Sequence, residues 1–197
     1  MITIKELLSR YQSGSVTPQE HIHSLLESIR QGFHESKDPA WICVATSENI
    51  EKQLSKLESL TSQKTMANLP LYGIPFAIKD NIDAAGWETT VACPDFAFEP
   101  QKNATVVEKL LNAGAILIGK TNLDQFATGL VGTRSPFGAV PNTFDPSYVS
   151  GGSSSGSASV VARGLACFSL GTDTAGSGRI PAAFNNIVGT KPTPGLV

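Results

Sequence analysis

Residues 150–179 of the chain read SGGSSSGSASVVARGLACFSLGTDTAGSGR. Turn residues, mostly serine and glycine, fill both ends of this stretch, and its middle predicts a helix over Ser157–Arg163 and a strand over Cys167–Leu170. A flexible linker would share the composition of Ser150–Ser159. Because apolar helix or strand residues lie close on both sides, a packed functional turn is the better interpretation.

The sequence before this stretch, from Leu69 onward, alternates short apolar runs with helical segments and glycine-rich turns. The predicted elements are strands at Ile74–Ile78 and Ala115–Ile118 and helices at Val106–Leu111 and Leu123–Thr128. This alternation favours an α/β fold with a mixed, mostly covered β-sheet flanked by helices. The closing residues, Gly189–Val197, predict a strand that leads into a turn, so the fold is expected to be truncated at this end.

The first third of the chain predicts helices instead. The predicted elements are a short helix around Leu7, Leu8 and Tyr11, a second that starts at Pro18 and includes His21–Ile29, a third from near Ser47 to Leu60, and a polar loop at Gln63–Asn68. We therefore divide the chain into an N-terminal helical segment, residues 1–68, and a core, residues 69–197, that is incomplete at its C-terminus.

Charge and composition restrict the kind of partner. The 197 residues carry a formal net charge of −2 with both signs mixed along the chain, whereas a nucleic-acid-binding face needs clustered basic residues. Charged residues interrupt the apolar run at the start, so neither a leader peptide nor a membrane span is predicted. Cys43, Cys93 and Cys167 are odd in number and lack a CxxC pair, which indicates reduced thiols in a cytoplasmic protein.

One segment, Gly114–Thr121, matches the phosphate-loop pattern with the letters GAILIGKT. A phosphate loop follows a strand, precedes a helix and bends so that its backbone N–H groups point at the phosphates. Here the inner residues, Ala115–Ile118, are apolar and rich in β-branched side chains. They predict a strand, and a helix is predicted before them, so nucleotide binding is disfavoured.

A second segment, Gly152–Gly156, matches the nucleophile-elbow pattern around Ser154. That mechanism needs a histidine base that follows the serine in the chain. The three histidines, His21, His23 and His34, all lie far upstream in predicted helices. A serine–histidine hydrolase and a histidine metal site are therefore disfavoured, and serine chemistry here would need another base.

A lysine can be that base. Lys79 ends the strand predicted at Ile74–Ile78, where burial would lower its pKa and favour the neutral amine. The cluster Ser153–Ser155 offers a hydroxyl that could relay a proton to it. In Gly171–Arg179, small residues leave backbone N–H groups uncovered next to Ser177, as an oxyanion hole requires. From the residues alone, a structural turn and a lysine that reaches solvent remain the alternative.

These motifs resemble the amidase signature family, whose hallmarks are a GGSS[GS]G turn, a later GTD-x-[GA]-GS segment and a lysine far upstream. The chain has GGSSSG at Gly151–Gly156 and GTDTAGS at Gly171–Ser177. Lys79 and Ser153 are 74 positions apart, and Ser153 and Ser177 are 24 apart, as in the family. The resemblance runs from about Leu69 to the end of the chain.

The resemblance implies a Ser-Ser-Lys triad. Ser177 would be the nucleophile that accepts the acyl group. Ser153 would be the bridging serine, with a cis peptide bond at Gly152–Ser153 or next to it. Lys79 would be the general base and later the acid.

Other site residues are implied by the same resemblance. The oxyanion hole would consist of the backbone N–H groups of Thr174, Ala175, Gly176 and Ser177. The acyl pocket would include Ala127, Thr128 and Gly129, while Asp173 and Arg179 would brace the nucleophile turn. Neither a metal nor an organic cofactor is implied.

Within the family, three stretches are similar to allophanate hydrolases: Thr89–Pro100, Thr121–Asn142 and Gly176–Thr193. This implies an amidohydrolase of urea degradation that cleaves allophanate to ammonia and carbon dioxide through an acyl-enzyme. A general amidase, an A-type subunit of a glutamyl-tRNA amidotransferase and an inactive truncated fragment remain alternatives.

The family domain is longer than this chain. Its other half would supply further strands and the groups that grip the substrate carboxylate. The expected partners are therefore a small amide substrate and either a C-terminal half or a second copy of the chain, with no nucleic acid and no membrane.

Overall fold

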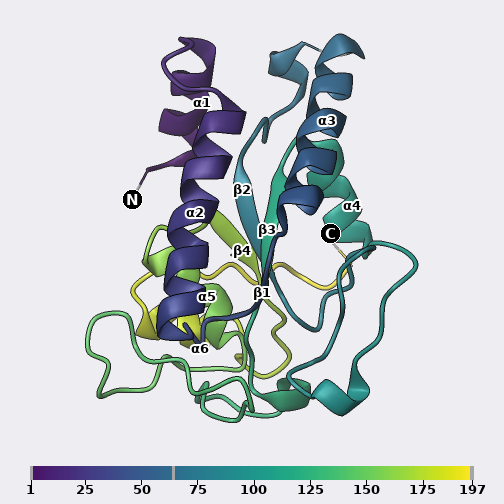
Figure 1. Cartoon of the computed structure of the whole chain (residues 1–197). Coiled ribbons are helices and arrows are strands. Elements are labelled where there is room, and N and C mark those ends of the chain that lie inside the picture. Colours follow the sequence, from purple (N-terminus) through teal and green to yellow (C-terminus); the bar gives the residue numbers. More distant parts are fainter. Residues whose placement is uncertain (1, 64, 196–197) are drawn as a thin grey trace.

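Four strands form a mixed sheet at the centre of the computed structural model (Figure 1), which describes residues 2–63 and 65–195. They are β1 (Trp41–Val44), β2 (Pro75–Lys79), β3 (Ile116–Thr121) and β4 (Phe168–Leu170), in the order β1-β3-β2-β4. The central strand β2 runs parallel to β3 and β4, while β1 runs antiparallel to β3. The predicted α/β class with a mixed sheet is confirmed.

Helices cover the sheet. They are α1 (Ile4–Gln12), α2 (Pro18–Ser36), α3 (Ser47–Gln63), α4 (Thr105–Asn112), α5 (Ser155–Ala162) and α6 (Arg179–Phe184). In Figure 1, α2 and α5 lie on one side of the strands and α3 and α4 on the other. Every residue of β2 and β3 is buried, as expected for parallel strands with both faces covered.

One large apolar cluster joins the helices to the sheet. Ile22 and Leu26 of α2 and Leu54 of α3 pack in the same cluster as Phe76 of β2 and Leu117 of β3. This cluster draws on both sides of the predicted boundary at residue 68, and that boundary stays a prediction.

The first two helices begin where local chemistry favours a helix start. Thr3 and Thr17 are N-caps, and each forms a reciprocal capping box with the glutamate three residues later, Glu6 or Glu20. Pro18 occupies the first turn of α2, as its position after Thr17 predicts.

The helix α3 also completes the hydrogen bonding of the sheet. Strand β1 pairs with β3 only from Gly119 to Thr121. The Ala45 N–H adds one hydrogen bond to the Ile118 carbonyl at 2.9 Å, and at Leu117 the side-chain amide of Gln53 forms the hydrogen bonds that a neighbouring strand would form. Its Nε2 donates to the Leu117 carbonyl at 2.9 Å, and its Oε1 accepts from the Leu117 N–H at 2.8 Å.

Several expectations from the sequence are wrong in detail. Strand β1 and helix α6 are absent from the predicted elements, because each is too short to show a clear periodicity. Leu123–Thr128 is not a helix but contains a single 3-10 turn at Gln125–Ala127, with a positive φ at Phe126 and Ala127. Gln63 still belongs to α3 instead of opening the polar loop.

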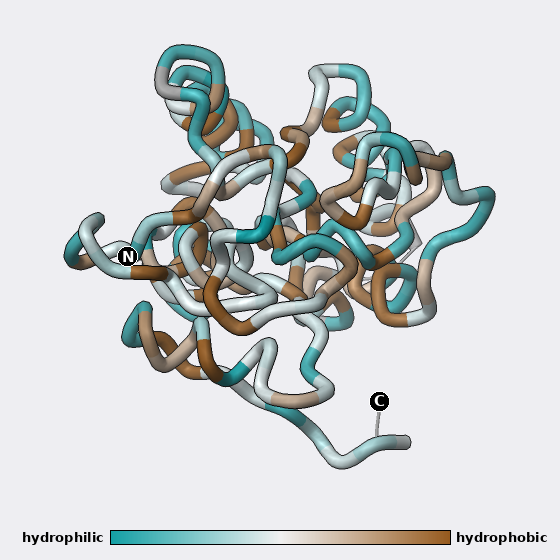
Figure 2. Tube along the Cα trace, turned by 90° about the horizontal axis from the view of Figure 1, so that it is seen from below, coloured by the Kyte–Doolittle hydropathy of each residue, from teal (hydrophilic) through white to brown (hydrophobic). Residues whose placement is uncertain are grey.

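The strand predicted at Gly189–Val197 is also wrong. Residues 189–195 contain a turn but no strand, and residues 196–197 lie outside the described part of the chain. Residues 188–195 are exposed, and Figure 2 shows the last described residues running away from the body of the molecule.

Within residues 2–63 and 65–195, none of the helices is both long enough and apolar enough to span a membrane. The three cysteines are free thiols, and burial raises the pKa of Cys43 and Cys167 to about 11.

The tight packing of α5 gives a test of the fold. A Cβ on Gly156 would overlap the Ala40 carbonyl oxygen and lie 2.6 Å from the Asn122 nitrogen. We expect Gly156→Ala to lower the free energy of unfolding by about 1–3 kcal/mol, since backbone atoms must move. Urea unfolding followed by circular dichroism measures this loss.

Gly32→Ala is the matched control, because Gly32 lies inside α2 and a Cβ there would meet nothing within 4 Å. We expect this variant to gain about 0.5–1 kcal/mol. Equal stability of the two alanine variants would contradict the packing of α5.

Candidate active site

The parallel strands bring two predicted site residues, and Asp124, which was not predicted, to one edge of the sheet. Strands β2, β3 and β4 run in the same direction, so their carboxyl ends meet at this edge. Lys79 is the last residue of β2, Asp124 follows β3, and Ser177 lies in the turn after β4. Ligands of open α/β sheets commonly bind at such an edge.

Lys79 is fully buried there and contacts two hydroxyl groups. Its Nζ lies 2.6 Å from the Oγ of Ser153 and 2.8 Å from the Oγ1 of Thr172. Burial lowers the pKa of Lys79 to about 8, although the carboxylates of Asp124 and Asp173 oppose this shift. At pH 7 about a tenth of such an amine is neutral.

Two further residues were not predicted from the sequence: Thr172, which contacts this amine, and Asn81, which contacts Thr172. Thr172 Oγ1 accepts hydrogen bonds from Lys79 and, at 3.2 Å, from the Nδ2 of Asn81. Thr172 directly follows the Gly171 that ends the apolar run of β4, and Asn81 lies two residues after Lys79. Polar residues just past the ends of adjacent parallel strands were the signal that could have identified both.

Ser153 lies in a buried turn directly before α5. The peptide bond between Gly152 and Ser153 is cis, as the family resemblance implies. The Ser153 carbonyl accepts the Asp124 N–H at 3.1 Å, and the Gly152 N–H donates to the Leu130 carbonyl at 2.8 Å.

A backbone hydrogen bond ties this turn to the predicted nucleophile. The Ser154 N–H donates to the Ser177 carbonyl at 3.0 Å, and the Ser154 hydroxyl donates to the Thr172 carbonyl at 3.2 Å. Ser177 is 7% exposed, whereas Ser153 is fully buried. The structure therefore brings the segments of Lys79, Ser153 and Ser177 together.

Asp173 organises the turn that carries Ser177. Its carboxylate accepts the backbone N–H groups of Gly176, Gly178 and Arg179, at 2.8, 3.1 and 3.0 Å. The Arg179 guanidinium donates to both of its oxygens and holds the pKa of Asp173 well below its usual range. These two residues brace the turn, as the family resemblance implies.

This arrangement changes the expected oxyanion hole in one respect. The Gly176 N–H points to Asp173 and is not free in this structure. Within the described residues, the N–H groups of Thr174, Ala175 and Ser177 form no hydrogen bond, so the expected oxyanion hole is reduced to these three donors.

The expected pocket residues Ala127, Thr128 and Gly129 lie in a loop next to the Ser153 turn. Ala127 closes the 3-10 turn after Asp124, and Gly129 lies so close that a Cβ there would be 2.8 Å from the Asp124 carboxylate. Thr128 is exposed and lines a surface hollow of about 550 Å³ together with Gln125, Phe126, Arg134, Ser135 and Pro136.

The structure explains the residues of the phosphate-loop pattern and the three histidines without a role in nucleotide binding or catalysis. Gly119 and Lys120 of the phosphate-loop pattern belong to strand β3. The buried Lys120 amine lies 3.1 Å from the Asp80 carboxylate and donates to the Glu88 carbonyl and the Thr89 hydroxyl. The three histidines lie in α2, and His23 faces Glu51 of α3 at 3.3 Å.

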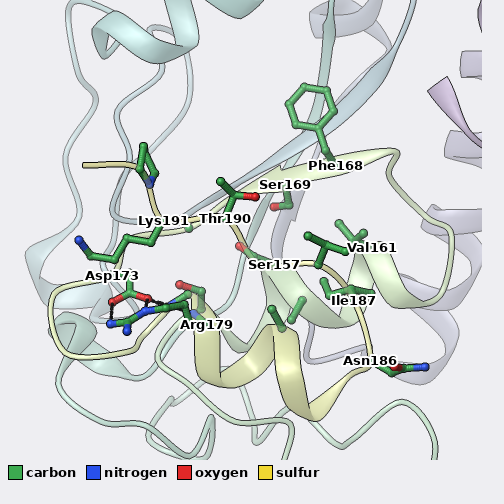
Figure 3. Close-up of a pocket in the computed structure, with 18 of the residues that line it drawn as sticks. Ser157, Val161, Phe168, Ser169, Asp173, Arg179, Asn186, Ile187, Thr190 and Lys191 are labelled. Atoms are coloured by element: carbon green, nitrogen blue, oxygen red, sulfur yellow. Dashed lines mark hydrogen bonds and ion pairs between the residues drawn. The ribbon is translucent and has the colours of Figure 1, made fainter. Parts of the chain in front are cut away.

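A groove lies beside the candidate site (Figure 3). It has a volume of about 700 Å³, and its walls come from α5, β4, α6 and the segment after α6. Val161, Phe168 and Ile187 form its apolar side, and the Asp173–Arg179 ion pair lies at its other end. In the part of the chain that the structure describes, no three His, Cys, Asp or Glu residues are grouped as a metal site would require.

Comparisons with known proteins identify the family of this chain. The family model described as Amidase matches residues 25–197. The urea amidolyase of Saccharomyces cerevisiae (strain ATCC 204508 / S288c) is 59% identical over 173 residues, which are 87% of this chain and 9% of that protein. The A-type subunit of the glutamyl-tRNA(Gln) amidotransferase of Symbiobacterium thermophilum (strain DSM 24528 / JCM 14929 / IAM 14863 / T) is 44% identical over 198 residues, covering 100% of this chain and 40% of that protein.

A solved structure is similar as well. The allophanate hydrolase of Kluyveromyces lactis superposes with a TM-score of 0.79 and 49% identity, over 92% of this chain and 29% of that chain. The chain thus spans less than half of the length of each of these relatives. The family model nevertheless covers most of the chain, and the chain belongs to the amidase family.

Proposed function

We propose that this chain carries the catalytic centre of an amidohydrolase that cleaves allophanate through an acyl-enzyme on Ser177. The observation that carries the proposal is the buried Lys79 amine 2.6 Å from the Ser153 hydroxyl, on a turn that is hydrogen-bonded to Ser177. Similarity to a urea amidolyase and to an allophanate hydrolase supports allophanate as the substrate.

Acylation begins with two proton transfers. Neutral Lys79 accepts the Ser153 proton while Ser153 accepts the Ser177 proton. One N–H of the neutral amine continues to donate to Thr172, and the nitrogen lone pair can then accept the Ser153 O–H. The Ser177 oxygen then bonds to the amide carbon, and the carbonyl π electrons move onto the oxygen.

The three uncovered N–H groups of Thr174, Ala175 and Ser177 stabilise the resulting oxyanion. As the carbonyl re-forms, the C–N bond breaks and ammonia leaves with a proton from Ser153, which Lys79 replaces. Water attacks the acyl group by the reverse relay and frees Ser177. The released N-carboxylated carbamate decomposes to carbon dioxide and ammonia.

A second candidate is the amide-donor reaction of a glutamyl-tRNA amidotransferase A-type subunit. The 44% identity to a protein of that kind, over the full length of this chain, favours it. The same Ser-Ser-Lys chemistry would then release ammonia from glutamine, so the two candidates differ in substrate and not in catalytic residues. A general amidase would prefer a simple amide such as propionamide.

The substrate is tested by measuring ammonia release from allophanate, glutamine and propionamide in parallel with the purified protein. We expect release from allophanate and a loss of at least about 10³-fold in Ser177→Ala, because the nucleophile is missing. Release from glutamine alone would favour the transamidase reaction, and release that persists in Ser177→Ala would refute the proposed nucleophile.

The chemistry of the site can be tested without a natural substrate. A fluorophosphonate reacts with activated serines, and intact mass spectrometry should find one adduct in the wild-type protein and none in Ser177→Ala. Ser154→Ala, which alters the nucleophile-elbow pattern, should still gain the adduct. The opposite result for these two variants would assign the nucleophile to Ser154.

The rate of this labelling should depend on pH in a defined direction. Only the neutral Lys79 amine is a base, and its pKa lies at about 8. The labelling rate should therefore rise with pH and level off above about 8. Lys79→Met should slow labelling by about 10²–10⁴-fold and abolish the rise. A pH profile that is the same in both proteins would exclude Lys79 as the base.

A further inference from the structure

Asp124 is a fully buried carboxylate just beyond the end of β3, with no role in the steps above. Its Oδ2 accepts the N–H groups of Val131 and Gly132, at 3.2 and 3.0 Å, and its Oδ1 accepts the Arg134 N–H at 2.9 Å. Among the described residues, no cationic side chain forms an ion pair with it. Backbone donors alone therefore compensate the burial of this charge.

The same residue holds the turn of Ser153. The Asp124 N–H donates to the Ser153 carbonyl at 3.1 Å. The loop of residues 130–134, whose N–H groups donate to the Asp124 carboxylate, also contains the Leu130 carbonyl, which accepts the Gly152 N–H at 2.8 Å. A Cβ on Gly152 would overlap the Asp124 Oδ2, so the carboxylate lies against the Gly152 backbone. Asp124 thus holds the peptide unit after Ser153 directly, and the loop around its carboxylate holds the peptide unit between Gly151 and Gly152.

The charges around Lys79 make Asp124 distinctive. Asp80, the next residue of the chain, pairs with Lys120, and Asp173 pairs with Arg179. Asp124 and Asp173 are the carboxylates that favour the protonated Lys79 amine. Of these two, Asp124 is the one whose charge no cationic side chain in the described part of the chain balances.

We propose that Asp124 is a positioning residue that holds the Ser153 turn against the Lys79 amine and places an unpaired negative charge beside that turn. The inference rests on the proposed roles of Lys79 and Ser153. Its electrostatic part concerns the amine itself and can be measured without any turnover.

The first experiment titrates the Lys79 amine by NMR in protein labelled with ¹³C-lysine. The Lys79 ¹³Cε signal is assigned by its absence in Lys79→Met. In Asp124→Asn we expect the midpoint to move to lower pH, by about half a unit or more, because the charge that favours the ammonium form is lost. Asp38→Asn is the matched control. Asp38 pairs with Arg163 at a distance of 2.8 Å and is not among the carboxylates that act on Lys79, so the titration midpoint of Lys79 should not change.

The second experiment separates position from charge by the rate of fluorophosphonate labelling at high pH. Asp124→Glu keeps the charge but displaces it, and Gly152→Ala pushes the turn away from the carboxylate. Both variants should lower the limiting rate of labelling at high pH by about tenfold or more, while the titration midpoint of Lys79 stays near that of the wild-type protein. Asp124→Asn should lower the rate and move the midpoint.

Folded Asp124→Asn with an unchanged Lys79 midpoint would overturn the inference, since a purely structural residue would lower only the folded fraction. If Asp124→Asn does not fold, Asp124→Glu decides: an unchanged limiting rate would overturn the positioning role. Absence of labelling in the wild-type protein would refute the proposed nucleophile, while the NMR titration would still test the charge of Asp124.

Discussion

The candidate site depends on one buried amine whose neighbours are hydroxyl groups. Lys79 is fully buried at the end of β2, and the groups that meet its nitrogen belong to Ser153 and Thr172. Lys120, one strand away and equally buried, meets the carboxylate of Asp80 instead. A carboxylate compensates the charge of a buried ammonium group, whereas a hydroxyl can form a hydrogen bond with either the protonated or the neutral amine. This difference supports the proposal that Lys79, and not Lys120, exchanges a proton.

Parallel strand direction explains why residues far apart in the chain can meet at this amine. The turns after β2, β3 and β4 share one edge of the sheet, and α5 starts at that edge. Ser157 of α5 joins two of the strands, because its hydroxyl contacts the Thr121 hydroxyl at 2.7 Å and the Leu170 carbonyl at 3.0 Å. The small side chains of α5 allow this close approach, as the position of Gly156 against Ala40 indicates.

Much of this arrangement could be predicted from the sequence, for definite reasons. The long apolar runs of β2 and β3 and the capping residues of α2 are local signals, and the spaced serine motifs identify the family. Thr172, Asn81 and Asp124 were missed because their roles arise only when turns from different strands meet. Strand β1 was missed because four residues carry too little periodicity, and its pairing is fixed by distant partners.

The side chain of Gln53 determines more than the hydrogen bonds of one residue. Strand β1 is short and has a bulge between Trp41 and Cys43, so few backbone hydrogen bonds fix its register on β3. The Ala45 N–H still donates to the Ile118 carbonyl at 2.9 Å, and the amide of Gln53 pairs with Leu117 beyond it, where it blocks a shift of β1 in that direction. Slippage would also carry Ala40 away from Asn122, whose N–H it accepts at 3.0 Å and whose carbonyl accepts the Gly156 N–H. A helix on the face opposite α5 thereby helps to fix the alignment from which the Ser153 turn and α5 start.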